Sequence, residues 1–156
     1  MNNNIENINI DEFYMPKISF GVVNDYKYIP KFYKPKVIKK GWGQEVVIAN
    51  NKEFCGKLLI YNKAGVKSSA HFHAGESGKH EVFHVYCGSF LFNFWDEKGF
   101  MKETELKTGD AVEIPRNTPH RLTPLEGNSI IFEVSNEHKD EDVVRFIPGA
   151  SQKNEQ

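Results

Sequence analysis

The sequence predicts an all-β protein made of short antiparallel strands. From Val37 onward, apolar runs alternate with turn signals at close spacing, and no helical period emerges before the C-terminus. Within one run, Phe90, Phe92 and Phe94 share one face, because side chains two positions apart in a strand point the same way. Glycine and asparagine stand between the runs and tolerate the positive φ that chain reversals require.

The chain divides into an arm, a β domain and a tail. Its 156 residues suit one domain that buries its own core. Residues 1–35 begin rich in asparagine and contain three prolines, so we expect an arm with short strands over 18–23 and 26–29. This arm either packs on its own domain or donates a strand to a partner subunit. Residues 149–156 are predicted to form a loose tail.

Nine strands are predicted between the arm and the tail. In chain order they cover residues 45–49, 54–61, 69–74, 81–86, 90–96, 101–106, 111–114, 121–123 and 129–135.

Composition argues against two classes of partner. The formal net charge of −1 gives no field that would attract nucleic acid or an anionic membrane, and the basic residues are scattered. No apolar run reaches the roughly 18 residues that span a bilayer, and the start lacks the regions of a signal peptide. We therefore expect a cytoplasmic protein. Cys55 and Cys87 lie in apolar runs and are expected to be buried free thiols.

Four side chains are predicted to meet as metal ligands. His71 and His73 stand two apart in a strand-like run, which puts both imidazoles on one face. Glu81 opens the next strand, and His120 follows a turn rich in proline and asparagine. Neutral imidazole nitrogens and a carboxylate oxygen suit one divalent ion of Mn, Fe, Co, Ni or Zn, whereas sulfur ligands select softer metals.

An alternative is that the paired histidines are half exposed and the glutamate is a charge at the rim. The independent appearance of a second motif with its own histidine weighs against this interpretation. His84 is out of phase with Glu81 and is expected to face away from the metal. His80 and His138 are expected to lie in solvent.

The spacing of the four ligands resembles the two motifs of the cupin superfamily. The first motif is matched by Gly65, five residues, His71-x-His73, a gap, Glu81, six residues and Gly88. The second is matched by Gly109, five residues, Pro115-x-Asn117, two residues and His120. This resemblance implies a cupin double-stranded β-helix over residues 36–148, a jelly-roll-like antiparallel barrel, and a homodimer. The gap before Glu81 is longer than usual, so residues 74–80 are expected to form a hairpin loop at the rim.

Flanking segments are similar to the cupin domain of type II mannose-6-phosphate isomerases. The likeness extends from about Val37 to Phe146 and rests on residues 40–43, 114–122, 132–134 and 141–146. It implies an enzyme of carbohydrate metabolism that interconverts the aldose and ketose forms of a sugar or sugar phosphate. In that reaction the metal polarises the carbonyl, while Glu133 or Lys57 moves a proton between neighbouring carbons.

The strand faces of these two base candidates are ambiguous. Lys57 shares a face with Leu59 and Tyr61, and either face of that strand can be inside. An inward Lys57 would bind an anion or shuttle a proton, whereas an outward one is a surface lysine. Glu133 lies opposite an apolar set, Ile130, Phe132 and Val134, which is expected to occupy the core. Its role as a base is therefore implied only by the resemblance.

Arg116 and Arg121 flank His120 and are candidates for substrate binding. A guanidinium there would clamp a phosphate or carboxylate with two parallel hydrogen bonds. The alternative is that both are surface charges.

Three functions are compatible with these residues, and fold alone does not choose among them. The first is the metal-dependent aldose–ketose isomerase. The second is a metal-dependent dioxygenase, in which iron would bind oxygen at the open metal positions. The third is a non-catalytic module that binds a small sugar-like ligand.

Overall fold

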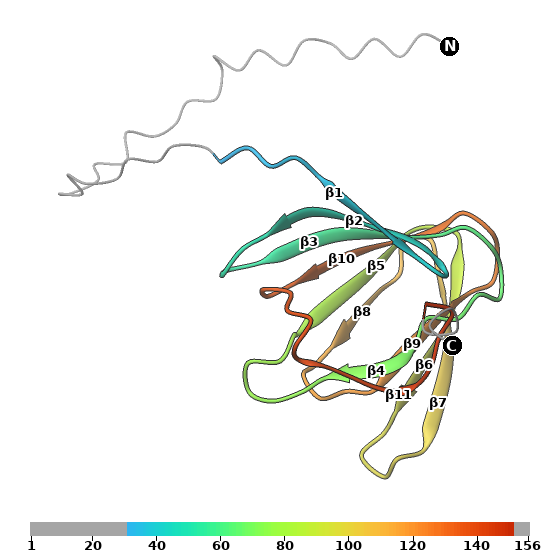
Figure 1. Cartoon of the computed structure of the whole chain (residues 1–156). Coiled ribbons are helices and arrows are strands. Elements are labelled where there is room, and N and C mark those ends of the chain that lie inside the picture. The colour runs from blue at the N-terminus through green and yellow to red at the C-terminus, as the bar shows by residue number, and fades with distance from the viewer. Residues whose placement is uncertain (1–30, 152–156) are drawn as a thin grey trace, which may run out of the picture. The chain divides into compact units, whose positions relative to one another are not determined.

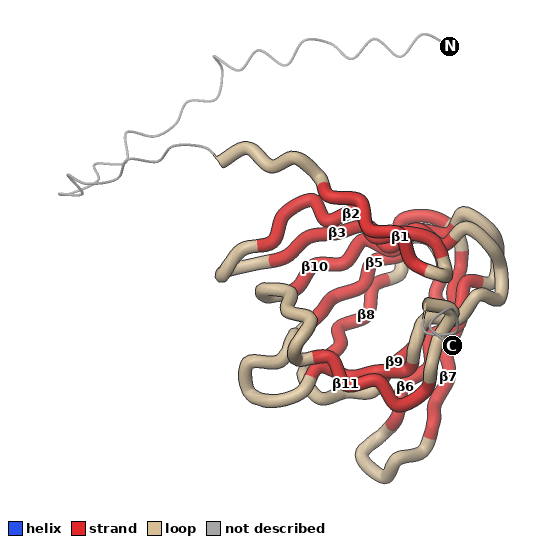
Figure 2. The backbone as a smooth tube through the Cα atoms, viewed as in Figure 1, coloured by secondary structure: helices blue, strands red, loops and turns tan. Residues whose placement is uncertain are grey.

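Eleven β-strands run through residues 31–151, the part of the chain that the computed structural model describes, and no helix lies among them (Figures 1 and 2). Their bounds are β1 (Lys36–Lys40), β2 (Gly43–Asn50), β3 (Cys55–Tyr61), β4 (Ala70–His73), β5 (Glu81–Cys87), β6 (Ser89–Trp95), β7 (Met101–Lys107), β8 (Ala111–Ile114), β9 (His120–Pro124), β10 (Ser129–Ser135) and β11 (Val143–Ile147). None of the described segments is a helix able to cross a membrane.

All nine predicted strands are present, and two were missed. β1 has the sequence KVIKK, in which three lysines hide the alternation of a strand. β11 follows a charged segment and pairs with β4, a partner about seventy positions earlier in the chain. The two strands expected over 18–23 and 26–29 lie outside the described residues.

The strands form two antiparallel sheets whose inner faces meet. The first sheet has the order β1-β2-β3-β10-β5-β8 and the second β11-β4-β9-β6-β7 (Figure 1). Apolar side chains from both sheets share one core, which contains Leu59, Phe83, Val85 and Ile131 from the first and Phe90, Phe92, Leu106 and Leu122 from the second. The ring of Tyr61 stacks on Trp42 and meets Phe90 edge-on, with centroids 4.4 and 5.3 Å apart.

The structure shows which face of β3 and which face of β10 points into the core. Lys57 is buried on the inner face of β3, with Leu59 and Tyr61. Glu133 is buried on the inner face of β10, so the expectation that the apolar set opposite it would occupy the core is wrong. Glu133 stands directly opposite Lys57 in the ladder, and the ammonium compensates the charge that burial would otherwise penalise.

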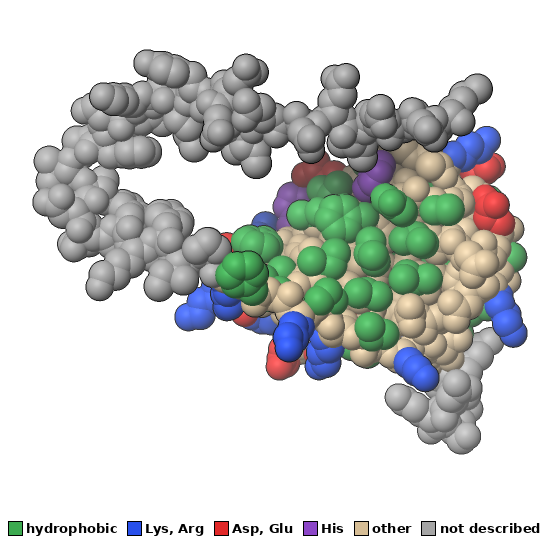
Figure 3. Space-filling model, turned by 90° about the horizontal axis from the view of Figure 1, so that it is seen from above, with side chains coloured by type: hydrophobic (Ala, Val, Ile, Leu, Met, Phe, Trp, Pro, Cys, Tyr) green, Lys and Arg blue, Asp and Glu red, His purple; other side chains and the backbone are tan. Residues whose placement is uncertain are grey.

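Ile130, Phe132 and Val134 of β10 face outward, together with apolar residues at paired positions on neighbouring strands. Val46, Leu58 and Phe132 stand in register across β2, β3 and β10. Figure 3 shows hydrophobic side chains gathered over this face of the first sheet, where Val82 is 40% and Val134 is 44% exposed. The inner face of β10 carries one apolar side chain, Ile131, among polar ones, whereas the outer face is wholly apolar, so alternation alone identified the wrong face as inner.

The cysteines and the first tail residues differ from expectation. Neither cysteine forms a disulfide, as predicted, but only Cys55 is buried, whereas Cys87 at the end of β5 is exposed. Residues 149–151, assigned to the tail, pack against the domain. The backbone N–H of Ala150 donates to the Lys67 carbonyl at 3.0 Å, and Gly149 lies so close to Ser68 and Ser69 that a Cβ would overlap their backbone.

Candidate functional site

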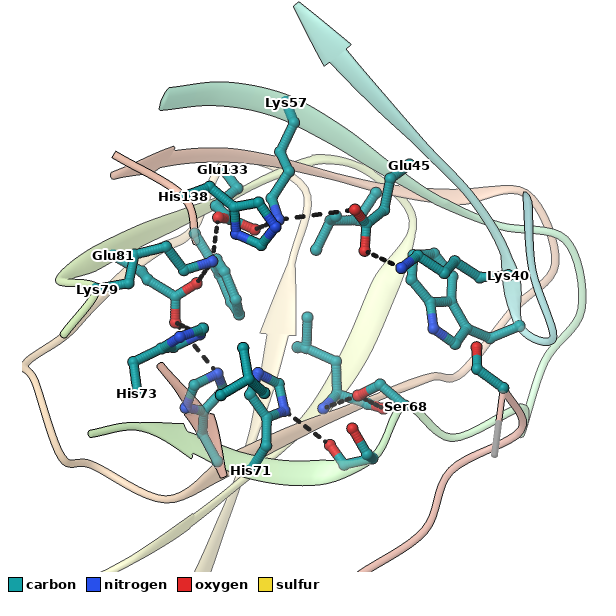
Figure 4. Close-up of a pocket in the computed structure, with 18 of the residues that line it drawn as sticks. Lys40, Glu45, Lys57, Ser68, His71, His73, Lys79, Glu81, Glu133 and His138 are labelled. Atoms are coloured by element: carbon teal, nitrogen blue, oxygen red, sulfur yellow. Dashed lines mark hydrogen bonds and ion pairs between the residues drawn. The ribbon is translucent and has the colours of Figure 1, made fainter. Parts of the chain in front are cut away.

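The four predicted ligands line one cavity between the two sheets (Figure 4). His71 and His73 come from β4, Glu81 from the start of β5 and His120 from the start of β9. One ladder pair, His71 opposite His120, joins β4 to β9 and brings the two sequence motifs together. Antiparallel neighbours in register share a face, so both imidazoles point to the same side of their sheet.

All three imidazoles are held through Nδ1 by groups that can only accept a hydrogen bond. His71 Nδ1 lies 3.1 Å from the Ser69 carbonyl and His120 Nδ1 lies 2.9 Å from the Thr118 carbonyl. His73 Nδ1 lies 2.6 Å from a carboxylate oxygen of Asp142. Each Nδ1 must therefore carry the proton, which leaves the lone pair on Nε2 free to bind a ligand.

Burial favours the neutral form of all three rings. Burial, with the nearby charge of Lys79, lowers the pKa of His73 to about 2. Burial also lowers the pKa of His120 to about 4 and holds that of His71 well below its ordinary value. A neutral imidazole with a free Nε2 is the form that coordinates transition metals.

Three buried polar atoms converge without hydrogen-bond partners: His73 Nε2, His120 Nε2 and Glu81 Oε2. The carboxylate oxygen lies 3.6 Å from the first nitrogen and 3.3 Å from the second. Two ligands about 2.1 Å from one ion at right angles would be about 3.0 Å apart, so both separations are somewhat wider than in a formed site. As the side chains stand, no group of three or more His, Cys, Asp or Glu within residues 31–151 is arranged to hold a metal ion. The donor types and the unpartnered atoms fit a divalent metal.

Lys79 lies at this site, although its segment was expected to form a loop at the rim. Its side chain is buried, and Nζ lies 2.5 Å from Glu81 Oε1 and 2.7 Å from Glu133 Oε1 (Figure 4). Burial alone would lower the pKa of Lys79, but the two carboxylates outweigh it and raise that pKa. The loop is tied down as well, because Arg116 Nε donates to the Gly78 carbonyl at 2.8 Å. Lys79 is therefore a fixed internal cation beside a predicted metal ligand.

Acidic and basic side chains alternate along the wall of the cavity. Lys57 Nζ lies 3.3 Å from Glu133 Oε2 and 3.8 Å from Glu45 Oε2, and Lys40 Nζ lies 3.4 Å from Glu45 Oε1. Burial opposes ionisation of Glu133, yet the ammonium groups of Lys57 and Lys79 lower its pKa below the ordinary value. Glu133 is thus an ionised carboxylate inside the cavity, and both lysines beside it are already paired.

The predicted arginines do not line the cavity. Arg121 follows His120 in β9, so strand alternation turns it to the outer face, where it donates to Asn93 Oδ1 at 3.3 Å. Arg116 is exposed and holds the loop at Gly78. A different arginine, Arg145 in β11, stands opposite His71 in the ladder and does line the cavity. It makes no ion pair within the described part of the chain.

The remaining histidines divide between surface and site. His84 lies on the face of β5 opposite to Glu81, as predicted. His80 is partly exposed and pairs with Glu113 at 2.8 Å. His138 was expected in solvent, but it lines the cavity and its Nδ1 is buried without a partner. Neither Lys79 nor His138 has a periodic pattern around it, so no signal in the sequence separates them from surface residues.

No protein-family model matches the sequence, and no curated protein matches it. Solved structures, however, are similar to it in fold. Oxalate decarboxylase from Bacillus subtilis at pH 4.6 is similar over 78% of this chain, with a TM-score of 0.64 and 18% identity. The capsular polysaccharide assembling protein CapF from Staphylococcus aureus is similar over 74%, with a TM-score of 0.62 and 18% identity. The matches cover 34% and 33% of those chains, so this chain spans about a third of their length. Both are cupin-fold proteins, and the chain has the all-β cupin fold.

Proposed function

We propose that the chain is a metal-dependent enzyme that interconverts the aldose and ketose forms of a sugar or sugar phosphate. One observation carries the proposal. Two buried imidazole nitrogens and a buried carboxylate oxygen converge without partners, in the same cavity as an ionised carboxylate that is not among the proposed ligands. A metal site beside a separate base is what such an isomerisation needs.

The metal would be held by His71, His73, His120 and Glu81. A bound divalent ion of Mn, Fe, Co, Ni or Zn would supply Lewis acidity toward the carbonyl oxygen of the substrate. The Mn(II) centres of Bacillus subtilis oxalate decarboxylase, a protein of similar fold, support manganese as the first ion to try.

Glu133 is the proposed base. Its carboxylate would take a proton from the carbon next to the carbonyl and return it to the former carbonyl carbon. Lys57, 3.3 Å away, and Lys79, 2.7 Å away, keep that carboxylate ionised and fix its position. A second group must move the hydroxyl proton between the two neighbouring oxygens. His138 has the free, buried Nδ1 for this step.

The cavity favours a mostly uncharged, polyhydroxylated substrate. Each lysine of the wall already has a carboxylate partner, so hydroxyl groups rather than anions match the bulk of its surface. Arg145 is a cavity-lining cation without such a partner in the described residues and is the proposed contact for a phosphate. The fold likeness to CapF, a capsular polysaccharide assembling protein, supports a carbohydrate ligand. The homodimer and the cytoplasmic location remain predictions.

Deuterium exchange tests the reaction. Metal-loaded protein is incubated in deuterated water with pentoses, hexoses and their phosphates, and products are analysed by NMR. The proposal predicts an aldose–ketose pair with deuterium on the carbon beside the carbonyl, because a proton held by Glu133 can exchange with solvent. The proposal would be overturned if the protein converted none of these sugars when loaded with any of the five metals. Oxygen uptake by the iron-loaded protein would then favour the dioxygenase, and saturable sugar binding without turnover would favour the binding module.

A further inference from the structure

The two side-chain oxygens of Asp142, the residue just before β11, contact two different parts of the site. Oδ1 lies 2.6 Å from His73 Nδ1. Oδ2 accepts a hydrogen bond of 3.0 Å from the backbone N–H of Lys79. The carboxylate is nearly buried, with its side chain 9% exposed, and it lies 69 positions from His73 in the sequence. Its position is therefore a product of the fold and not of any local motif.

The two partners of Asp142 are both donors. A backbone N–H can only donate, and the ring nitrogen that lies 2.6 Å from a carboxylate oxygen donates as well. Asp142 thereby fixes the proton of His73 on Nδ1 and directs the free Nε2 toward Glu81 Oε2, 3.6 Å away. The carbonyl groups that hold His71 and His120 do the same for those rings, but they are backbone atoms that no substitution removes.

The second oxygen extends this control to Glu81. By holding the backbone of Lys79, Asp142 places the ammonium that contacts Glu81 Oε1 and leaves Oε2 turned toward the histidines. We propose that Asp142 is a positioning residue that sets the tautomer of His73 and, through Lys79, the orientation of Glu81, so that both present free donors to one metal ion. The effect on metal affinity rests on the proposed function, whereas the tautomer does not.

The substitution Asp142→Asn separates this role from simple packing. Asparagine keeps the shape but offers one acceptor and one donor. The Lys79 N–H cannot change, so the amide oxygen must face it and the amide NH₂ must face His73 Nδ1. The ring can then satisfy the amide only by moving its proton to Nε2, which blocks the nitrogen that would bind metal.

Two measurements test the tautomer of His73 and its consequence for metal binding separately. The tautomers of all histidines are read by long-range ¹H–¹⁵N NMR in metal-free protein, and Co²⁺ affinity is measured by calorimetric titration. Glu113→Gln is the matched control, because it alters a histidine–carboxylate pair of similar length, 2.8 Å, at the partly exposed His80. His71 and His120 are internal controls in every spectrum.

In the wild type we expect His73 to carry its proton on Nδ1. In Asp142→Asn it should carry the proton on Nε2, His71 and His120 should be unchanged, and the Kd for Co²⁺ should rise about 10–100-fold. Glu113→Gln should leave all three rings and the affinity unchanged. A wild-type His73 protonated on Nε2 would overturn the inference even if the variant did not fold. So would an Asp142→Asn protein with the wild-type tautomer. If the tautomers were as expected but the wild-type protein did not bind Co²⁺, the proposed metal site would be contradicted. The role of Asp142 in setting the tautomer of His73 would still stand.

Discussion

Lys79 Nζ lies 2.7 Å from Glu133 Oε1, and both side chains are buried. This pair links the loop before β5 to the middle of β10 across 54 positions. Because the same ammonium also contacts Glu81, one cation compensates the proposed base and a proposed metal ligand together. Its removal should therefore leave two buried carboxylates without a shared partner.

We expect Lys79→Met to lower the free energy of unfolding by about 3–5 kcal/mol, the usual cost of breaking a buried ion pair from one side. Urea unfolding of the metal-free protein measures it. Lys102→Met is the control, because Lys102 is 54% exposed and pairs with Asp96 at 3.5 Å, so its loss should cost at most about 1 kcal/mol. Equal effects of the two substitutions would show that Lys79 is not buried between carboxylates.

Glu133→Gln should abolish most turnover and leave the metal in place. The substitution removes the proposed base but none of the proposed ligands, so kcat should fall by about 10²–10⁴-fold while metal content stays the same. Glu105→Gln, an exposed glutamate beside Lys107, should change neither quantity. Normal turnover in Glu133→Gln would assign proton transfer to another group.

Arg145→Ala should weaken phosphorylated sugars more than neutral ones. Loss of a charged hydrogen bond should cost about 1.5–3 kcal/mol for a phosphate and little for a neutral sugar. Arg121→Ala serves as the control, because its guanidinium binds Asn93 on the outer face. Competition binding with matched sugars and sugar phosphates measures both variants. If Arg121→Ala gave the larger discrimination, the phosphate would bind outside the cavity.

The two thiols should differ in reactivity. Cys87 is exposed, whereas burial raises the pKa of Cys55 and keeps its thiol protonated and covered. Iodoacetamide at pH 8 should therefore modify one thiol in the folded protein and two in urea, as counted by mass spectrometry. Cys87→Ser should reduce the folded count to zero. Modification of both thiols at equal rates in the folded state would contradict the buried position of Cys55 on the inner face of β3.

The sequence allowed the strands and the proposed ligands to be predicted because both follow short-range rules. Alternation and turn residues located nine strands, and two histidines two apart had to share a face. The same rule could have placed Arg121, since the residue after His120 in a strand points the other way. It failed at Glu133 because the more apolar face of β10 is the outer one, and only pairing with Lys57 identifies the inner face.

Lys79, His138 and Arg145 could not be found in this way. Lys79 is fixed by Asp142, 63 positions later, and Arg145 meets the site only because β11 pairs with β4. Asp142 and Arg145 reach the site because the last strand, β11, pairs with β4 at the edge of the second sheet. The spacing of motifs carries no information about such long-range pairings.

Metal analysis of purified variants tests the central claim most directly. Metal per chain is measured after reconstitution and desalting for the wild type, His73→Ala, Glu81→Ala and His84→Ala, the last altering a histidine on the opposite face of β5. We predict about one divalent ion per chain in the wild type and in His84→Ala, and loss of most metal in the other two, because each removes one ligand of a single site. Full occupancy in His73→Ala and Glu81→Ala, or loss in His84→Ala alone, would contradict the proposed centre.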